Sequence, residues 1–395
     1  MKRSNMIKLA TGLATLLLVT TTVNADDSKP FSKHKFFGFS QIGVQAGDGA
    51  INKDNQNGKM KMDADRIRLG WKYFSGPLAG KVFLDFSKTG DSGSGMPNII
   101  KDAFIAYKVN NAAVVKAGMI KTPVGMGFTI PGWNLDVIKR GFDKKLAFER
   151  AAGLMLSGRA IGGSGKVNGL EMGHERPWHG FGYDLMISGQ TGRSGAVKNA
   201  KVGNNNAYMG RVMYDNGQAL HIEAGYGVSK EAGGTNGAKD VSKNVITTTN
   251  LEDYKVFNIG IDSHFDGANV KAEYYDTKNI QGVKNWNMKT VALTGTYYFT
   301  DTLEGAVKYI SGSGDKGTTS AKASNTYIGL NYYIHPKNNK MDRKSRRSRN
   351  QHRIQINYVL AGGDAGKANA NTVFKYAGGA FYKDNAILAQ YQFKF

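Results

Sequence analysis

The sequence has 395 residues, a formal net charge of +22 at pH 7 and no cysteine. The lack of cysteine excludes a disulfide framework, a thiolate nucleophile, a thiolate zinc site and an iron–sulfur cluster. Hydrophobic residues make up 41% of the chain, but its mean hydropathy of -0.40 is more polar than one buried core of this size would give, and the positive charge indicates anionic partners.

The first 25 residues have the three parts of a secretory signal peptide. Basic side chains precede an apolar run over residues 9–19, and a small-residue cleavage site follows at 23–25. The basic residues are Lys2, Arg3 and Lys8. The apolar run is well short of the roughly 20 residues that a spanning helix needs, so a retained inner-membrane anchor is the weaker alternative. We expect residues 1–25 to be cleaved and residues 26–395 to form one exported domain.

Segments of about ten residues that alternate apolar and polar side chains recur through the region after the signal peptide. The segment 65–74 is typical, because one face carries large apolar groups and the other carries cations and glycine. The first face has Ile67, Leu69, Trp71 and Tyr73, and the second has Arg66, Arg68, Gly70 and Lys72. Successive side chains of a strand point to opposite faces, so the pattern predicts strands with lipid on one side and water on the other.

Sixteen such strands are predicted, and short turns alternate with longer loops rich in Gly, Ser, Asn and Lys. The predicted strands cover residues 35–46, 63–74, 80–88, 100–109, 112–120, 166–173, 180–189, 207–215, 219–228, 255–265, 269–277, 290–300, 302–311, 324–335, 353–361 and 386–395. A soluble periplasmic β-sandwich would also have short strands, but it would not need this regular rhythm. We therefore predict an all-β fold, a transmembrane antiparallel β-barrel of about 16 strands.

The last strand ends on Phe395, and a terminal aromatic residue of this kind resembles the export signal of outer-membrane proteins. A closed barrel satisfies every backbone group in lipid, which open strands cannot do. The predicted location is therefore the outer membrane of a Gram-negative bacterium.

Four stretches resemble the phosphate-selective porin O and P family. They are Arg66-Ile67-Arg68-Leu69-Gly70, Ala117-Gly118-Met119-Ile120-Lys121-Thr122-Pro123-Val124-Gly125, Tyr297-Tyr298-Phe299-Thr300-Asp301-Thr302-Leu303-Glu304 and Gly329-Leu330-Asn331-Tyr332-Tyr333-Ile334-His335-Pro336. Together they span nearly the whole mature chain. The resemblance implies a sixteen-stranded trimeric channel whose third loop folds inward, with Lys and Arg side chains that lead anions to the constriction.

The segment that matches this third loop is residues 121–159, the longest stretch without clear alternation. Fixed ammonium and guanidinium groups in a narrow passage offset the hydration that an anion loses there. The predicted pore-lining and anion-binding residues are Arg66, Arg68 and Lys72 on a strand, Lys101, Lys108 and Lys116 behind them, and Lys121, Lys139, Arg140, Lys144, Lys145, Arg150 and Arg159 in the loop. For any one of them, a solvated loop position or contact with lipopolysaccharide phosphates is the alternative.

The segment 337–353 departs from the expected pattern, because a short periplasmic turn should follow Pro336 and a strongly basic insert stands there instead. Its composition predicts a solvated loop. Contact with periplasmic polyanions or peptidoglycan is the alternative.

Catalytic and metal motifs are weak throughout the chain. No G-x-S-x-G elbow occurs, the paired acids Asp262 and Asp266 lie by a predicted turn, and the Gly-rich stretch at 162–165 lacks the helix context of a phosphate-binding loop. The scattered histidines are His174, His179, His221 and His264. A nucleic-acid partner would suit the basic charge, but export and strand periodicity argue against it.

The sequence thus predicts a porin, with no catalytic residues, cofactor or metal, that passes small anions such as phosphate or polyphosphate by passive diffusion. The expected partners are small anionic solutes, outer-membrane lipid and lipopolysaccharide, and further copies of the chain in a homotrimer. A general non-selective porin is one alternative. An outer-membrane hydrolase or a surface-binding barrel is the alternative from another class.

Overall fold

The computed structural model describes residues 32–47, 60–88, 99–172, 178–189, 206–217, 219–230, 252–334 and 351–395. The predicted signal peptide and most of the predicted basic insert at 337–353 lie outside these residues.

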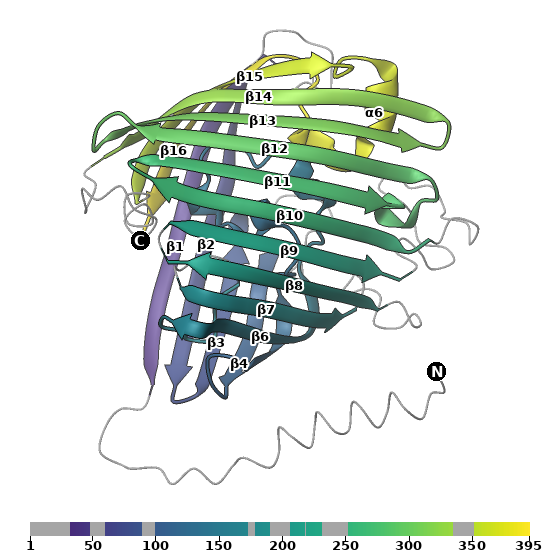
Figure 1. Cartoon of the computed structure of the whole chain (residues 1–395). Helices are drawn as coiled ribbons and strands as arrows, with labels where there is room; N and C mark the ends of the chain where they lie inside the picture. The colour runs from purple at the N-terminus through teal and green to yellow at the C-terminus, as the bar shows by residue number, and fades with distance from the viewer. Residues whose placement is uncertain are drawn as a thin grey trace.

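The described residues form sixteen antiparallel strands that close into one barrel (Figure 1). The strands are β1 (Lys33–Ala46), β2 (Lys61–Ser75), β3 (Leu78–Asp85), β4 (Ile100–Lys108), β5 (Val114–Ile120), β6 (Ala151–Ser164), β7 (His179–Ser188), β8 (Ala207–Asn216), β9 (Leu220–Ser229), β10 (Tyr254–Phe265), β11 (Ala268–Lys278), β12 (Trp286–Tyr298), β13 (Leu303–Lys316), β14 (Thr319–Tyr333), β15 (His352–Gly363) and β16 (Ala386–Lys394). The barrel closes where β1 pairs with both β2 and β16. The terminal Phe395 takes part, since its backbone exchanges two 3.1 Å hydrogen bonds with Gly38.

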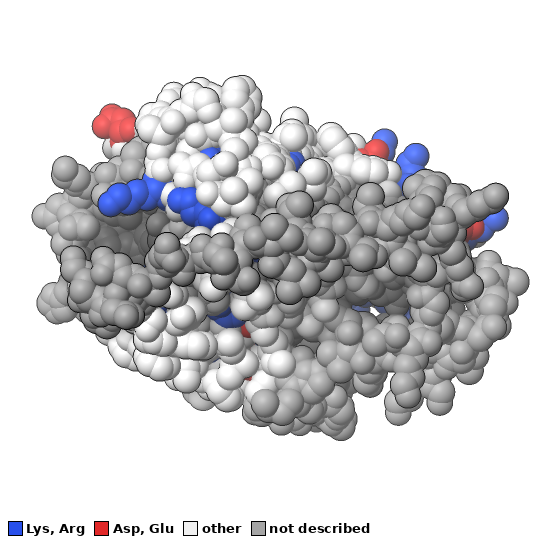
Figure 2. All heavy atoms as spheres, turned by 90° about the horizontal axis from the view of Figure 1, so that it is seen from below, with Lys and Arg blue, Asp and Glu red and all other residues white. Residues whose placement is uncertain are grey.

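The outward face of the strands is apolar and the inward face is polar. In β10, for example, Phe257, Ile259 and Ile261 are exposed on the outside, whereas Asn258 and Asp262 are buried inside. This distribution is the reverse of that in a water-soluble protein, and it suits a wall between hydrocarbon and an aqueous interior. In Figure 2, a view from below, the described surface between the residues drawn in grey is mostly uncharged, and Lys and Arg appear there in a few small groups.

Helices are short in the part of the chain that the structure describes, and none of them there is long and apolar enough to cross a membrane. They are η2 (Phe86–Lys88), α3 (Met126–Thr129), η3 (Gly132–Asn134), η4 (Asp143–Leu146), η6 (Ile280–Gly282), α6 (Ala368–Val373) and η7 (Lys375–Ala380). The connection between β5 and β6, residues 121–150, is called L3 below. It contains α3, η3 and η4, and it lies inside the barrel.

The prediction for the sixth strand was wrong. It covered 166–173, but β6 is Ala151–Ser164, so L3 ends at Arg150 and not at Arg159. Two features hid this strand. Leu154, Met155 and Leu156 interrupt the alternation, and the pairing with β7 shifts register twice after Gly158. Because the side-chain period of a strand is two, each irregularity reverses the pattern that the sequence shows.

The remaining strands lie where the alternation predicted them, with ends that differ by a few residues. One of these differences corrects the predicted insert 337–353, because β15 already begins at His352 and Arg353 is a buried strand residue. The Gly-rich stretch at 162–165 also belongs largely to a strand, β6, and not to a loop.

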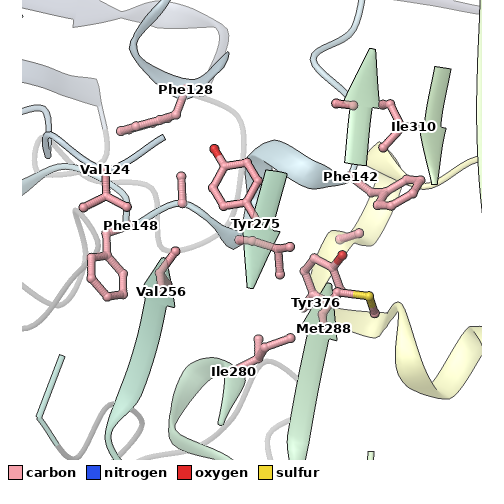
Figure 3. Close-up of a cluster of buried hydrophobic side chains, with 14 of the residues drawn as sticks. Val124, Phe128, Phe142, Phe148, Val256, Tyr275, Ile280, Met288, Ile310 and Tyr376 are labelled. Atoms are coloured by element: carbon pink, nitrogen blue, oxygen red, sulfur yellow. The ribbon is translucent and has the colours of Figure 1, made fainter. Parts of the chain in front are cut away.

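Aromatic side chains of L3 pack inside the barrel and hold the loop there (Figure 3). Phe142 lies edge-on to Phe374 and Phe381, which come from the connection between β15 and β16. Phe148 lies edge-on to Tyr254 of β10, with ring centroids 5.1 Å apart. The lumen is therefore partly filled by a loop with its own buried apolar core.

Candidate pore constriction

L3 is fastened to one side of the lumen by inward side chains of β14 and β15. The backbone N–H of Ile138 donates to Asn357 Oδ1 at 2.7 Å, and Asn331 Nδ2 donates to the Asp136 carbonyl at 2.9 Å. Arg353 Nη1 donates to the Leu135 carbonyl at 2.8 Å. These side chains satisfy loop backbone groups that would otherwise be buried without partners.

A second set of contacts fastens the start of L3 to β10 and β11. Gly125 N donates to Asn258 Oδ1 at 3.1 Å, and Gly127 N donates to Glu273 Oε2 at 2.9 Å. Gly125 has a φ of +98°, and a Cβ there would lie 2.3 Å from the Tyr275 hydroxyl. The sharp turn into the lumen therefore requires glycine at this position.

A cavity of about 400 Å³ lies between L3 and the inward faces of β2 to β4. Its charged lining residues are Arg66, Arg68, Lys81, Lys101, Lys121, Lys139, Arg140, Lys144, Lys145 and Arg150, together with Asp65, Asp85, Asp102 and Glu149. Ten cationic side chains thus face four carboxylates. Phe83, Phe128 and Trp133 supply aromatic surface between them.

Two carboxylates on the strand wall are each shared by two cations. Asp85 accepts from Arg68 Nε at 3.1 Å and lies 3.3 Å from Lys101 Nζ. Asp102 lies 2.6 Å from Lys81 Nζ and accepts from Arg150 Nε at 2.7 Å. Each trio keeps one net positive charge, so the ion pairs order the wall without neutralising it.

The loop side of the cavity is ordered in the same way. Lys144 donates to Glu149 Oε1 at 2.5 Å, Lys139 pairs with Asp65 of β2, and Arg140 donates to the carbonyls of Gly127 and Ile130. The side chain of Lys145 is exposed and has no ion-pair partner among the described residues.

Burial and neighbouring charges shift the titration of these loop groups. Burial lowers the pKa of Lys144 to about 8, although Glu149 opposes the shift. Burial alone would raise the pKa of Glu149, but Lys144, Lys101 and Arg150 hold it well below its usual range. The Lys144 and Glu149 pair is therefore charged at neutral pH.

Nine of the thirteen predicted residues line this cavity: Arg66, Arg68, Lys101, Lys121, Lys139, Arg140, Lys144, Lys145 and Arg150. Lys81 also lines it and was missed, although it alternates with the outward Val82 and pairs across the sheet with Lys72. The same alternation of inward and outward positions that predicted Arg66 and Arg68 would also have predicted Lys81. The four carboxylates were not predicted, because nothing in one sequence shows which acids lie opposite which bases.

The other four predicted residues point inward but do not line the cavity. Lys72 lies with its Nζ 4.8 Å from the Phe37 ring centroid. Lys108 donates to the Val167 carbonyl at 2.7 Å, and Lys116 donates to the Glu171 carbonyl. Arg159 Nη2 donates to both carboxylate oxygens of Asp184, each at 2.9 Å.

Lys116 and Arg159 belong to a buried ionic network on β5 to β9. At its centre, Arg211 of β8 donates to Asp184 at 2.5 Å, to Glu223 at 3.0 Å and to the Met172 carbonyl at 3.0 Å. His221 lies between Asp215 and Glu223, at 2.9 and 3.0 Å. The network holds residues 165–172, which follow β6, against the inner wall.

The histidines that the sequence singled out are not brought together into one site. His221 is buried in the ionic network, His264 lies 3.1 Å from Asp262, and His179 is exposed at the start of β7. His174 lies outside the described residues. Within the described ranges there is no group of three or more His, Asp or Glu residues that could hold a metal ion.

A closed antiparallel barrel with a loop folded into its lumen and a charged cavity beside that loop defines an outer-membrane channel protein. The chain belongs to the Gram-negative porin family, whose model matches residues 12–339. No curated protein sequence matches it. The matching model describes Gram-negative porins in general, which is coarser than the phosphate-selective family that the sequence motifs resemble.

Solved structures of low sequence identity share this fold. OmpF of Salmonella typhi in complex with daunomycin has a TM-score of 0.57 at 14% identity, over 92% of this chain and 98% of that one. The trimer form of Vibrio cholerae OmpT has a TM-score of 0.56 at 13% identity, over 93% and 100%. An anion-selective porin from Comamonas acidovorans has a TM-score of 0.55 at 15% identity, over 92% and 100%.

Proposed function

We propose that this porin conducts small anions by passive diffusion through the cavity between L3 and β2 to β4. The observation that carries the proposal is that ten Lys and Arg side chains, but only four carboxylates, line that cavity. An anion that enters a narrow passage loses part of its hydration, and fixed cations beside low-dielectric walls offset that loss. Several weak contacts in sequence then allow the anion to leave.

Phosphate and polyphosphate are the narrower candidates. Arg66, Arg68, Arg140 and Arg150 all line the cavity, and a guanidinium group can donate two hydrogen bonds to one oxyanion. The motifs shared with the phosphate-selective porin O and P family agree with this choice. The Comamonas acidovorans relative in fold is itself described as anion-selective.

The remaining parts of the proposal concern maturation and assembly. We infer that residues 1–25 are removed on export and that residues 26–395 act as a channel and not as an enzyme. The outward apolar face contacts lipid and lipopolysaccharide, and three copies assemble. A trimer form is described for Vibrio cholerae OmpT, which shares the fold. Migration of unheated and heated protein on a denaturing gel tests the assembly, since a stable trimer moves slowly until it is heated.

Reversal potentials in a planar lipid bilayer under a KCl gradient test the selectivity. The expected sign is that of an anion-selective channel, and a cation-selective channel would refute the proposal. A reversal potential near zero would favour the general non-selective porin. Added phosphate separates the narrower candidate from the broader one: inhibition of the chloride current supports a phosphate site, and an unchanged current leaves only general anion conduction.

A further inference from the structure

One aromatic ring in L3 has three cations around it. The ring centroid of Phe128 lies 5.0 Å from Lys121 Nζ, 5.1 Å from Lys144 Nζ and 5.9 Å from Arg150 Cζ. All four residues line the cavity between L3 and β2 to β4. Phe128 itself is almost fully buried, with 2% of its surface exposed, so its ring is packed among these groups.

Three like charges this close together repel one another, and each therefore needs a contact that holds it. Lys144 pairs with Glu149 and Arg150 pairs with Asp102, while Lys121 donates to the Thr129 carbonyl at 2.8 Å. The ring of Phe128 is the contact that all three cations share. Its negative face attracts each of them.

A carboxylate and an aromatic ring hold a cation with different consequences. A carboxylate cancels one positive charge for each pair that it forms. A neutral ring attracts a cation through its quadrupole and leaves the net charge unchanged. Phe128 can therefore order three cations without itself cancelling any of their charge.

The position of the ring is itself well determined. It lies in the short helix α3, where Thr129 Oγ1 donates to the Met126 carbonyl and Gly127 N is bound by Glu273 of β11. In Figure 3 the ring lies above Val124 and Tyr275, well away from Phe142. The loop thus presents the ring at a set place beside the wall of β2 to β4.

We propose that Phe128 is a positioning residue for anion selectivity, which holds Lys121, Lys144 and Arg150 toward the cavity without neutralising them. This inference rests on the proposed anion conduction. Phe128 does not itself contact the solute in this proposal. It acts through the three cations.

L3 supplies a matched control. Phe148 is also in L3 and is 1% exposed, but its ring packs on Tyr254, and none of the Lys or Arg residues among the described ranges lies over it. Phe128→Leu and Phe148→Leu remove comparable apolar volume from the same loop. Only Phe128→Leu also removes an aromatic ring that cations contact.

The experiment is a reversal-potential series in planar bilayers under a KCl gradient. Phe128→Leu is expected to lower the anion-to-cation permeability ratio roughly threefold, while Phe128→Tyr and Phe148→Leu keep the ratio of the unmodified channel. Equal losses in Phe128→Leu and Phe148→Leu would overturn the inference, because they would indicate general loosening of L3.

Fluorinated phenylalanines at position 128 test the mechanism even if Phe128→Leu does not fold. Added fluorine weakens the negative face of the ring and leaves its shape nearly unchanged. The permeability ratio is expected to fall stepwise from phenylalanine through monofluoro to trifluorophenylalanine. An anion-selective channel with a constant ratio across this series overturns the inference alone, whereas a cation-selective unmodified channel overturns the proposed function as well.

Discussion

The cavity beside L3 and the ionic network on β5 to β9 are built from the same kinds of residue on the same inward face of the barrel. In the network, Arg211 and Arg159 are both 2% exposed, and Asp184 and Glu223 take up their hydrogen bonds. In the cavity, cations outnumber carboxylates, and Lys145 is exposed without an ion-pair partner among the described residues. The arginines of the network are thus paired within the wall, whereas the cavity keeps an excess of positive charge.

This difference shows that inward direction and pore lining are separate properties. A cation that points into a barrel can either form ion pairs within the wall or face the passage for solutes. The segments that pack inside the lumen determine which of the two it does. L3 packs against β10 to β16, and residues 165–172 pack against the network, whereas the faces of β2 to β4 line the cavity beside L3. Buried ion pairs then support structure, whereas the surplus charge beside L3 is what the proposed anion conduction would use.

The largest expected effect is on stability, and it concerns the network. Arg211→Met would leave Asp184 and Glu223 buried without their shared cation, at a cost of about 3–5 kcal/mol in the free energy of unfolding. Urea titration of the protein in lipid vesicles, followed by gel migration, measures this. Lys145→Met in the cavity should leave the unfolding midpoint unchanged. A selectivity change in Arg211→Met with normal stability would contradict the distinction between the two regions.

A smaller loss of stability is expected where the loop meets the wall. Asn357→Leu removes the acceptor of the Ile138 N–H, and the buried donor left behind costs about 1–3 kcal/mol. Because L3 is then held less firmly, the open-channel current should become noisier. Thr290→Val on β12 is the control, since that buried hydroxyl has no hydrogen-bond partner among the described residues. Equal noise in both variants would show that Asn357 does not anchor the loop.

Most of the barrel could be predicted because alternation is a local property of each strand. Residues 65–74 show it clearly, and their inward arginines do line the cavity. In β6 the local pattern failed, since bulges near Ala160 and a run of apolar residues hid the period. The distinction between Arg66 and Arg159 was not predictable at all. It depends on where L3 and residues 165–172 pack, which is set by contacts between residues far apart in the chain.

Removing one cation from each region tests the charge difference directly. Lys145→Gln should lower the anion-to-cation permeability ratio by about fivefold at most, because one charge at contact distance in water is worth about 1 kcal/mol. Lys108→Gln should leave the ratio unchanged, since its ammonium group binds the Val167 carbonyl away from the cavity. Reversal potentials at two salt concentrations measure both variants, and screening should weaken the effect at high salt. A larger effect for Lys108→Gln than for Lys145→Gln would show that Lys108, and not Lys145, contributes to selectivity.

The smallest expected effect is a dependence of selectivity on pH. Burial lowers the pKa of Lys144 to about 8, so this side chain loses its positive charge as the pH rises from 7 to 8.5, while Glu149 keeps its negative charge. The cavity becomes less positive, and the anion-to-cation permeability ratio should fall by about twofold, since the change is one partly titrated charge in water. Lys144→Gln should lower the ratio at pH 7 and remove most of its pH dependence. A ratio that rises with pH, or an equal pH dependence in Lys144→Gln, would show that another group controls the charge of the cavity.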